Sequence, residues 1–311
     1  METSSKESKM VSAVVYLHND SEVVIPFLRV IGRLFSETFD FTEIILVNDC
    51  CTDDTISKII EFNQSAQYQL TLVNMSIYQG LEISMNAGID LSMGDFVYEF
   101  DDLTLDYNED IIISSYKHMA RGFDIISVAP SSDNTAVSGV FYWVFNRFSR
   151  SKYKLQSERF RILSRRAINR AYSISKTAPY RKALYANSGL SIDVIRYKMN
   201  PAIPKKPRQN PKLRNQIAVN ALILYTNLAF KIAITITITM LCLTAFAGVY
   251  AAVIYFIGEK PIAGWTTTML LLSGSFSGLF FVLTIIIKYL SLVVEIIDTK
   301  QTYLVESTQK L

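Results

Sequence analysis

Short runs rich in β-branched and aromatic residues alternate with helical runs over residues 12–128, and this alternation constrains the fold more than any other feature. The strand-like runs are mostly continuous in apolar residues, as in strands that are buried on both faces. Repeated strand–helix–strand units predict an α/β fold with a doubly wound, mostly parallel sheet. The predicted strands are 12–18, 43–48, 69–74, 95–100 and 124–128, and the predicted helices are 22–35, 53–63, 81–92 and 108–120.

The residues just after the strands are candidates for a ligand site, because ligands of such sheets bind beyond the carboxyl ends of the strands. Acids follow three of the first four predicted strands: Asp20 the first, Asp49 the second, and Asp101 and Asp102 the fourth. An aspartate after the second strand can accept hydrogen bonds from a base or a ribose. It can equally stabilise the positive end of the next helix, and the sequence alone leaves both interpretations open.

The stretch YEFDDLTLDYNED at residues 98–110 is rich in acids. Neighbouring carboxylates suit hard divalent cations, which prefer oxygen ligands. The alternative is a strand that runs out into a solvated loop.

Positive charge is concentrated between Arg147 and Arg170, where nine lysines and arginines accompany a single acid, Glu158. Such a stretch attracts anionic headgroups or phosphorylated ligands. Nucleic acid would be attracted too, but no recognised nucleic-acid-binding motif accompanies the charge, so we expect no nucleic-acid partner.

Two long runs near the C-terminus contain no charged residue. They cover Ile232–Gly258 and Pro261–Ile287, 27 residues each, and a helix needs roughly 20 residues to cross a bilayer. Only Glu259 and Lys260 separate them, so they predict an antiparallel transmembrane hairpin over 231–311, including a tail after the second helix. A buried helical hairpin in a soluble protein is the alternative.

The remaining boundaries follow from composition. Residues 1–10 form a polar tail without the apolar core of a signal peptide, and residues 201–230 form a basic linker with an interfacial helix. Residues 11–200 are then expected to be a cytoplasmic domain of a multi-pass protein in the inner or plasma membrane, since basic residues flank the first run. The three cysteines fit a reducing compartment and offer no metal-ligand spacing.

Three short stretches follow the first three predicted strands in order: LHND at 17–20, VNDCCTDDT at 47–55 and YQG at 78–80. They resemble the first two strand ends and the third motif of glycosyltransferase family 2. Further along, FYWVFNRFS at 141–149 and FRILSRR at 160–166 look like segments of the polyprenyl-phosphate glycosyltransferases of that family, which carry two C-terminal transmembrane helices.

The resemblance implies a GT-A-like fold and an enzyme that moves one sugar, with inversion, from a nucleotide sugar to a polyprenyl phosphate. It implies a divalent cation, Mg²⁺ or Mn²⁺, as cofactor, and membrane lipids and a second copy of the chain as further partners. The implied nucleotide-sugar ligands are Asn19, Asp20, Asp49 and Gly80; the catalytic and metal-binding residues are Asp101 and Asp102; the acceptor-phosphate ligands are Arg147, Arg161 and Arg165.

The chain also departs from the family pattern. Leu103 stands where the second aspartate of the family's Asp-x-Asp motif falls, unless a one-residue deletion places Asp102 there, and Arg159 replaces an aspartate before Phe160. A catalytically degenerate relative, acting as a membrane scaffold or regulatory subunit, is therefore the alternative from another functional class. Transfer to a glycan rather than to a lipid carrier is a third possibility.

Overall fold

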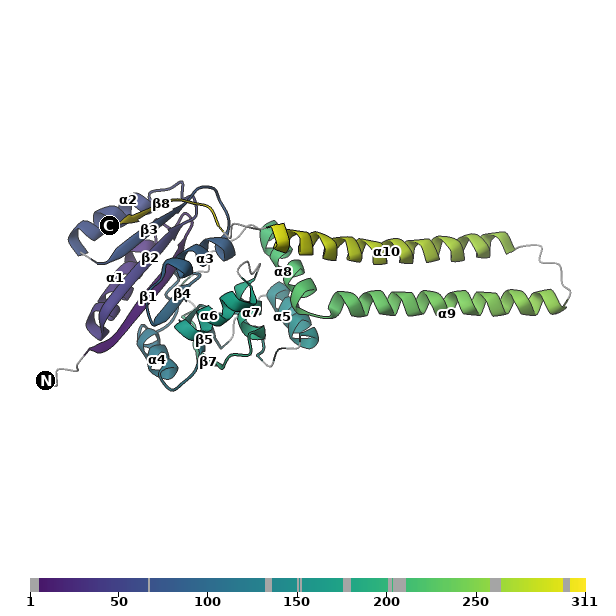
Figure 1. Cartoon of the computed structure of the whole chain (residues 1–311), viewed down its shortest axis with the longest axis horizontal. Coiled ribbons are helices and arrows are strands. Elements are labelled where there is room, and N and C mark those ends of the chain that lie inside the picture. The colour runs from purple at the N-terminus through teal and green to yellow at the C-terminus, as the bar shows by residue number, and fades with distance from the viewer. Residues whose placement is uncertain are drawn as a thin grey trace. The chain divides into compact units, whose positions relative to one another are not determined.

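The structure is a computed structural model that divides into two compact units, one formed by Met1–Ala221 with Lys300–Leu311 and the other by Leu222–Thr299 (Figure 1). The two units are described separately. The described residues are 6–66, 68–131, 136–149, 151, 153–175, 180–200, 203, 211–257, 264–298 and 303–311.

An eight-stranded sheet forms the first unit, in the order β7-β5-β6-β4-β1-β2-β3-β8. The strands are β1 (Glu7–Leu17), β2 (Phe39–Asn48), β3 (Leu70–Met75), β4 (Phe96–Phe100), β5 (Ile125–Pro130), β6 (Phe160–Ser164), β7 (Ile192–Tyr197) and β8 (Val305–Lys310). The helices of this part of the chain are α1 (Val24–Thr38), α2 (Thr55–Ala66), α3 (Leu81–Leu91), α4 (Asp110–Met119), α5 (Ala136–Phe148), α6 (Arg165–Ile174), α7 (Arg181–Asn187) and α8 (Pro211–Tyr225). The five predicted strands are β1 to β5 and the four predicted helices are α1 to α4, so the predicted α/β sheet is confirmed.

Parallel pairing dominates the centre of the sheet. Strand β1 pairs in parallel with β2 and with β4, and β2 pairs in parallel with β3. Strands β6 and β8 are antiparallel to their neighbours, so the sheet is mixed at these two positions. Strand β1 begins at Glu7 and thus takes in the end of the predicted polar tail.

Both faces of the central strands are covered, which explains their unbroken apolar runs. On one face, alternate residues of β1 such as Ala13 and Val15 pack with α1 and α4 in the main core. On the other face, a Cβ on Gly88 of α3 would lie 2.4 Å from Cγ1 of Val14 and 2.7 Å from Cγ2 of Val47. Glycine is therefore what allows α3 to lie this close to β1 and β2.

The register of the strands places the candidate residues at one edge. Leu17 pairs with Asn48, and Val15 pairs with Phe100, so β1, β2 and β4 end almost level. Residues 18–20, 49–51 and 101–102 therefore follow three neighbouring strand ends. Strand order reverses at β1, between β4 and β2, which is where ligands of open α/β sheets bind.

The second unit contains two long helices, α9 (Leu228–Ile257) and α10 (Gly264–Asp298), which lie side by side (Figure 1). Gly278 of α10 faces Met240 of α9, whose side-chain carbon atoms lie 3.1 Å from a Cβ placed on the glycine. The short connection at 259–260 lies outside the described residues, as do residues 201–202 and 204–210 of the predicted linker and interfacial helix at 201–230.

Over the described residues, a search finds no helix with both the length and the apolarity that crossing a membrane requires. This finding contradicts the predicted transmembrane hairpin and the predicted multi-pass membrane location. The prediction rested on the absence of charged residues from the two runs and not on a helix seen in the structure. In α9 the uncharged run includes Thr235, Thr237 and Thr239, whose hydroxyls donate to backbone oxygens of the preceding turn.

Candidate active site

Asp49, at the end of β2, organises the loops on one side of the candidate site. Its carboxylate is fully buried and accepts hydrogen bonds from the Tyr16 hydroxyl and from the N–H groups of Gln79 and Gly80, each 2.8 Å long. Gly80 presents its N–H at a φ of 82°, a conformation that glycine adopts without strain. Asp49 therefore ties the end of β2 to the loop between β3 and α3.

Asn19 and Asp20 connect the end of β1 to the loop after β2. The Asn19 side-chain oxygen accepts hydrogen bonds from the N–H groups of Thr52 at 2.8 Å and Asp53 at 3.3 Å. The N–H of Asp20 donates to the Thr55 hydroxyl at 2.9 Å. The four predicted nucleotide-sugar ligands, Asn19, Asp20, Asp49 and Gly80, are thus brought together on neighbouring loops.

Two aromatic rings lie beside these loops, in the stretches LHND and YQG, although neither was among the predicted ligands. The ring centroids of His18 and Tyr78 are 4.8 Å apart, and Tyr78 is 41% exposed. Nδ1 of His18 lies 2.7 Å from the backbone oxygen of Asp49, which can only accept, so Nδ1 carries the proton.

A second group of charged residues, the arginine–carboxylate cluster, surrounds the end of β4. It consists of Glu82, Glu99, Asp101, Glu158, Arg161 and Arg181. Arg161 donates from Nη1 to Glu99 at 2.5 Å, from Nη2 to Asp101 at 2.8 Å, and from Nε to Glu158 at 3.1 Å. Arg161 and Arg181 are each 1% exposed. A buried charge is stable only when it is paired, so the loss of any carboxylate partner would be destabilising.

Arg181 holds the other side of the same carboxylates. It donates from Nε to Glu82 at 3.0 Å and from Nη2 to Asp101 at 2.6 Å, while the Tyr185 hydroxyl donates to Glu99 at 2.5 Å. Both oxygens of Asp101 are therefore engaged by arginine. Burial alone would raise the pKa of Asp101, but the charges of Arg181 and Arg161 outweigh burial and hold the pKa far below its usual range.

Asp102 belongs to a neighbouring network that centres on Arg159. Its Oδ1 accepts from the N–H of Thr104 at 2.7 Å, and its Oδ2 accepts from Nη1 of Arg159 at 3.2 Å. Arg159 also donates to both oxygens of Asp106, which in turn accepts from the Tyr197 hydroxyl at 2.7 Å. The arginine that replaces the family's aspartate is thus a buried partner of two acids.

The predicted metal ligands do not fit a divalent cation. Leu103, at the position of the second motif aspartate, is 2% exposed and packs in the apolar core. Each oxygen of Asp101 and Asp102 already has a donor. Over the part of the chain that the structure describes, no group of three or more His, Cys, Asp or Glu side chains is arranged to hold a metal ion.

The three predicted acceptor-phosphate arginines lie in different places. Arg161 sits opposite Glu99 near the end of β4, inside the cluster. Arg165 lies at the other end of that strand, where its Nη2 donates to the backbone oxygens of Gly94 at 2.6 Å and Ser92 at 2.9 Å. Arg147 is exposed on α5 and takes no part in the cluster's ion pairs. The antiparallel run of β6 along β4 is what separates Arg161 from Arg165.

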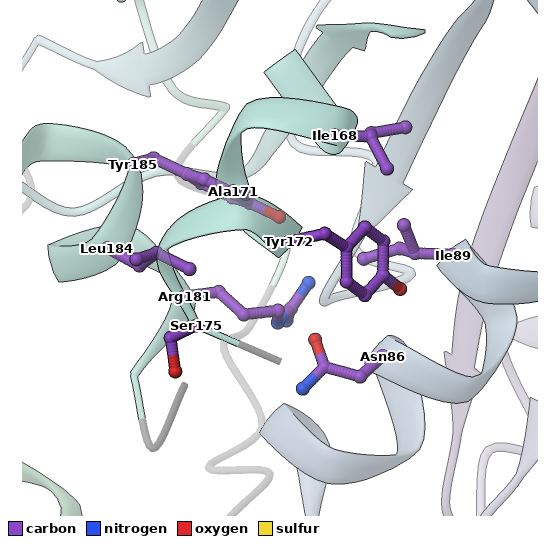
Figure 2. A pocket seen from close by; sticks show the side chains of 9 residues that line it. All are labelled: Asn86, Ile89, Ile168, Ala171, Tyr172, Ser175, Arg181, Leu184 and Tyr185. Atoms are coloured by element: carbon purple, nitrogen blue, oxygen red, sulfur yellow. The ribbon is translucent and has the colours of Figure 1, made fainter. Parts of the chain in front are cut away.

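A small cavity lies behind the cluster, between α3, α6 and α7. Its volume is about 20 Å³, which is room for about one water molecule. Figure 2 shows the Arg181 guanidinium pointing into it, toward Asn86 and Tyr172. Nη1 of Arg181 lies 3.0 Å from Glu99 but without hydrogen-bond geometry, and among the described residues it has no hydrogen-bond partner. This cavity is too small for a sugar nucleotide.

Sequence reasoning missed Glu99, Glu82 and Arg181. A signal for Glu99 was present, because a charged residue in the middle of an apolar strand must find a partner when it is buried. The partner could not be named, since Arg181 is 82 residues away in a segment without a recognisable motif.

The model of the family described as Glycosyl transferase family 2 matches residues 12–187, more than half of the chain. The chain belongs to glycosyl transferase family 2. The family 2 match covers β2 to β6, most of β1, and α1 to α7, and so includes all the loops described above.

A curated relative of this family 2 chain is an uncharacterized glycosyltransferase of Synechocystis sp., 26% identical over 174 residues. The alignment covers 54% of each protein, so the chain spans about half the length of the relative that it matches.

Two solved structures are similar to the family 2 chain in fold. Glucosyl-3-phosphoglycerate synthase of Mycobacterium tuberculosis, in complex with Mn²⁺, UDP-glucose and phosphoglyceric acid, has a TM-score of 0.52 at 13% identity, over 69% of this chain and 78% of that one. A mannosyltransferase of Pyrobaculum calidifontis, in complex with GDP-mannose and Mn²⁺, has a TM-score of 0.49 at 16% identity, over 89% and 88%. The first likeness shows a shared GT-A-type fold.

Proposed function

We propose that this chain transfers one sugar from a nucleotide-sugar donor to a polyprenyl phosphate. The observation that carries the donor half is the convergence of Asn19, Asp20, Asp49 and Gly80 on adjacent loops of a family 2 domain. The similar fold of a synthase that binds UDP-glucose supports the same class of donor.

The rings of His18 and Tyr78 extend this donor site. A partly exposed aromatic pair beside polar loops suits the flat face of a nucleobase, to which stacking contributes about 1–3 kcal/mol. Asp49 acts in this proposal by holding the loop of Gln79 and Gly80 in place.

The acceptor half rests on the segments 141–149 and 160–166, which resemble those of polyprenyl-phosphate glycosyltransferases. An oxygen of the acceptor phosphate attacks the anomeric carbon, a new carbon–oxygen bond forms, and the nucleoside diphosphate leaves with the electron pair of the broken bond. A phosphate is already an anion, so orientation and charge neutralisation matter more than a general base. A reaction that needs no strong general base is compatible with Asp101, because the neighbouring arginines lower its pKa and make it a weak base.

Of the predicted acceptor arginines, Arg147 is the one that stays available to a phosphate in this proposal, since it is exposed. Arg161 and Arg165 already donate to protein oxygens. The predicted Mg²⁺ or Mn²⁺ ion at Asp101 and Asp102 does not enter the proposed steps, because those carboxylates are engaged by arginine.

One observation favours a second candidate. The engagement of every Asp101 and Asp102 oxygen is also what a degenerate relative would show, if the protein kept the nucleotide site and lost transfer. Such a protein would bind nucleotide and act as a scaffold or regulatory subunit.

The test uses the full chain with a panel of radiolabelled UDP- and GDP-sugars and undecaprenyl phosphate, in EDTA and in MnCl₂. A labelled lipid product supports transfer. Nucleotide binding by calorimetry without any product supports the degenerate relative, and neither binding nor product from any donor contradicts both candidates.

A further inference from the structure

Two arginines from separate elements engage the carboxylate that follows β4. Arg161 comes from β6 and Arg181 from the first residue of α7, and both reach Asp101, one on each oxygen, at 2.8 and 2.6 Å. The family 2 match covers this strand end, which is where the resemblance places a divalent cation. Here that position is taken by two guanidinium groups.

The two arginines cannot easily give way to a cation. Both are 1% exposed, and each has further carboxylate partners that fix it: Glu99 and Glu158 for Arg161, Glu82 and Glu99 for Arg181. A divalent ion at Asp101 would have to displace both guanidinium groups from the aspartate's oxygens. Each buried arginine would then lose one of its carboxylate partners, which is unfavourable for a charge in the interior.

The oxygen ligands that a cation needs are also missing. Leu103 fills the second motif position with an apolar side chain in the core, and Asp102 is held by Arg159 and by the Thr104 N–H. Hard divalent cations take about six oxygen ligands, so an engaged aspartate beside a leucine is a poor site.

We infer that the strand-end motif of this chain binds no divalent cation, because Arg161 and Arg181 occupy both oxygens of Asp101 in its place. Insofar as a nucleotide binds here without a cation, the inference rests on the proposed function. Two consequences follow. Mn²⁺ does not bind to the protein alone, and nucleotide binding does not require Mn²⁺.

The first measurement is Mn²⁺ binding to the full chain, which is monitored through the electron paramagnetic resonance signal of the free ion. The wild-type chain should leave the Mn²⁺ signal unchanged. Arg181→Gln opens one oxygen of Asp101 and removes a positive charge, so this variant should bind Mn²⁺ at least about tenfold more tightly than the wild type, or 1.4 kcal/mol. Arg181→Lys keeps the charge and should behave like the wild type.

Arg166→Gln is the matched control, because Arg166 also pairs with an aspartate, Asp124 at 2.6 Å, but lies outside the cluster. It should not create Mn²⁺ binding. Circular dichroism shows which variants are folded. If Arg181→Gln does not fold, the Mn²⁺ measurement on the wild-type chain alone decides the inference.

The second measurement is calorimetric binding of UDP and of GDP to the wild-type chain in EDTA and in MnCl₂. Dissociation constants that agree within about threefold support the inference. Mn²⁺ binding by the wild-type chain, or a nucleotide affinity that falls about tenfold or more in EDTA, would overturn it. If neither nucleotide binds in either buffer, the proposed function fails, while the Mn²⁺ measurement still decides the inference.

Discussion

At the scale of single residues, Asp49 is the acid on which most of the loop geometry depends. Its carboxylate satisfies three donors in a place that water does not reach. Few side chains could replace it, because an aspartate in the interior is stable only when its oxygens are bonded.

Asp49→Ala should lower the free energy of unfolding by roughly 3–5 kcal/mol, since each buried donor left without an acceptor costs about 1–3 kcal/mol, the Gln79 N–H is only partly buried, and single substitutions rarely cost more than about 5 kcal/mol. Urea denaturation measures the loss. Asp54→Ala removes an exposed acid from the same loop and is the control, with an expected change within about 0.5 kcal/mol. A loss below about 1 kcal/mol for Asp49→Ala would show that the loop does not depend on these bonds.

Cys50, the next residue, is held in a left-handed conformation with a φ of 55°. This conformation costs a residue with a Cβ about 1 kcal/mol or more. We expect Cys50→Gly to raise the free energy of unfolding by up to about 1 kcal/mol and the β-branched Cys50→Val to lower it by about 2 kcal/mol, again by urea denaturation. Equal effects of the two substitutions would contradict the strained backbone.

At the scale of elements, β8 closes the open side of β3 and contacts the loop that Asp49 holds. Gln79 donates from Nε2 to the backbone oxygen of Leu304 at 2.7 Å and accepts from the N–H of Leu304 at 2.9 Å. One side chain thus connects the candidate nucleotide loop to the last strand.

Gln79→Ala removes both bonds and should cost about 1–2 kcal/mol. Hydrogen–deuterium exchange should then be faster in residues 305–310, while exchange in β1 and β2 stays unchanged. Ile77→Ala, a 57% exposed neighbour in the same loop, is the control. Unchanged protection of β8 in Gln79→Ala would mean that the ladder with β3 alone holds the strand.

The central elements could be predicted because their signals are local. Strands β1 to β5 and the four helices between them follow from runs and periods of five to fifteen residues, and the motif order indicated the family. Strand β8 could not be foreseen, since VESTQK alternates without an apolar core and is a strand only because β3 offers an edge. The placement of Arg165 away from Arg161 depends on the antiparallel register of β6, which sequence does not encode locally.

The difference between local and long-range signals also separates the predicted nucleotide-sugar ligands from the surroundings of Asp101. Asn19, Asp20, Asp49 and Gly80 were predicted together from the resemblance to family 2, and the structure brings them together because they follow neighbouring parallel strands. The environment of Asp101 depends instead on Arg181, whose approach is set by long-range packing.

At the scale of the whole molecule, stability at high pH depends on buried tyrosines. Burial, followed by the nearby Glu7 carboxylate, raises the pKa of Tyr116 to about 12, against 10.0 in an unperturbed tyrosine. Between these values the unfolded chain releases a proton that the folded chain keeps. The stabilisation is therefore complete below pH 10 and is lost as the pH rises toward 12.

We expect the free energy of unfolding to fall over about pH 10 to 12, and Tyr116→Phe to make that fall less steep. Urea denaturation at each pH gives the free energy, and tyrosinate absorbance gives the titration. Tyr250→Phe, which changes a 59% exposed tyrosine, is the control. A profile identical in Tyr116→Phe and wild type would remove Tyr116 from this pH dependence.

The pairing of β8 with β3 also sets an order of assembly. Val73 and Thr308 are neighbours in the sheet although more than two hundred residues separate them along the chain. During synthesis the ribosome releases β3 long before β8, so the growing chain carries an unpaired strand edge next to the candidate nucleotide loop until translation has reached residues 305–310. An exposed edge is a template for pairing with other chains. The nascent protein should thus depend most on chaperones, and be most prone to aggregation, in the interval between these two strands.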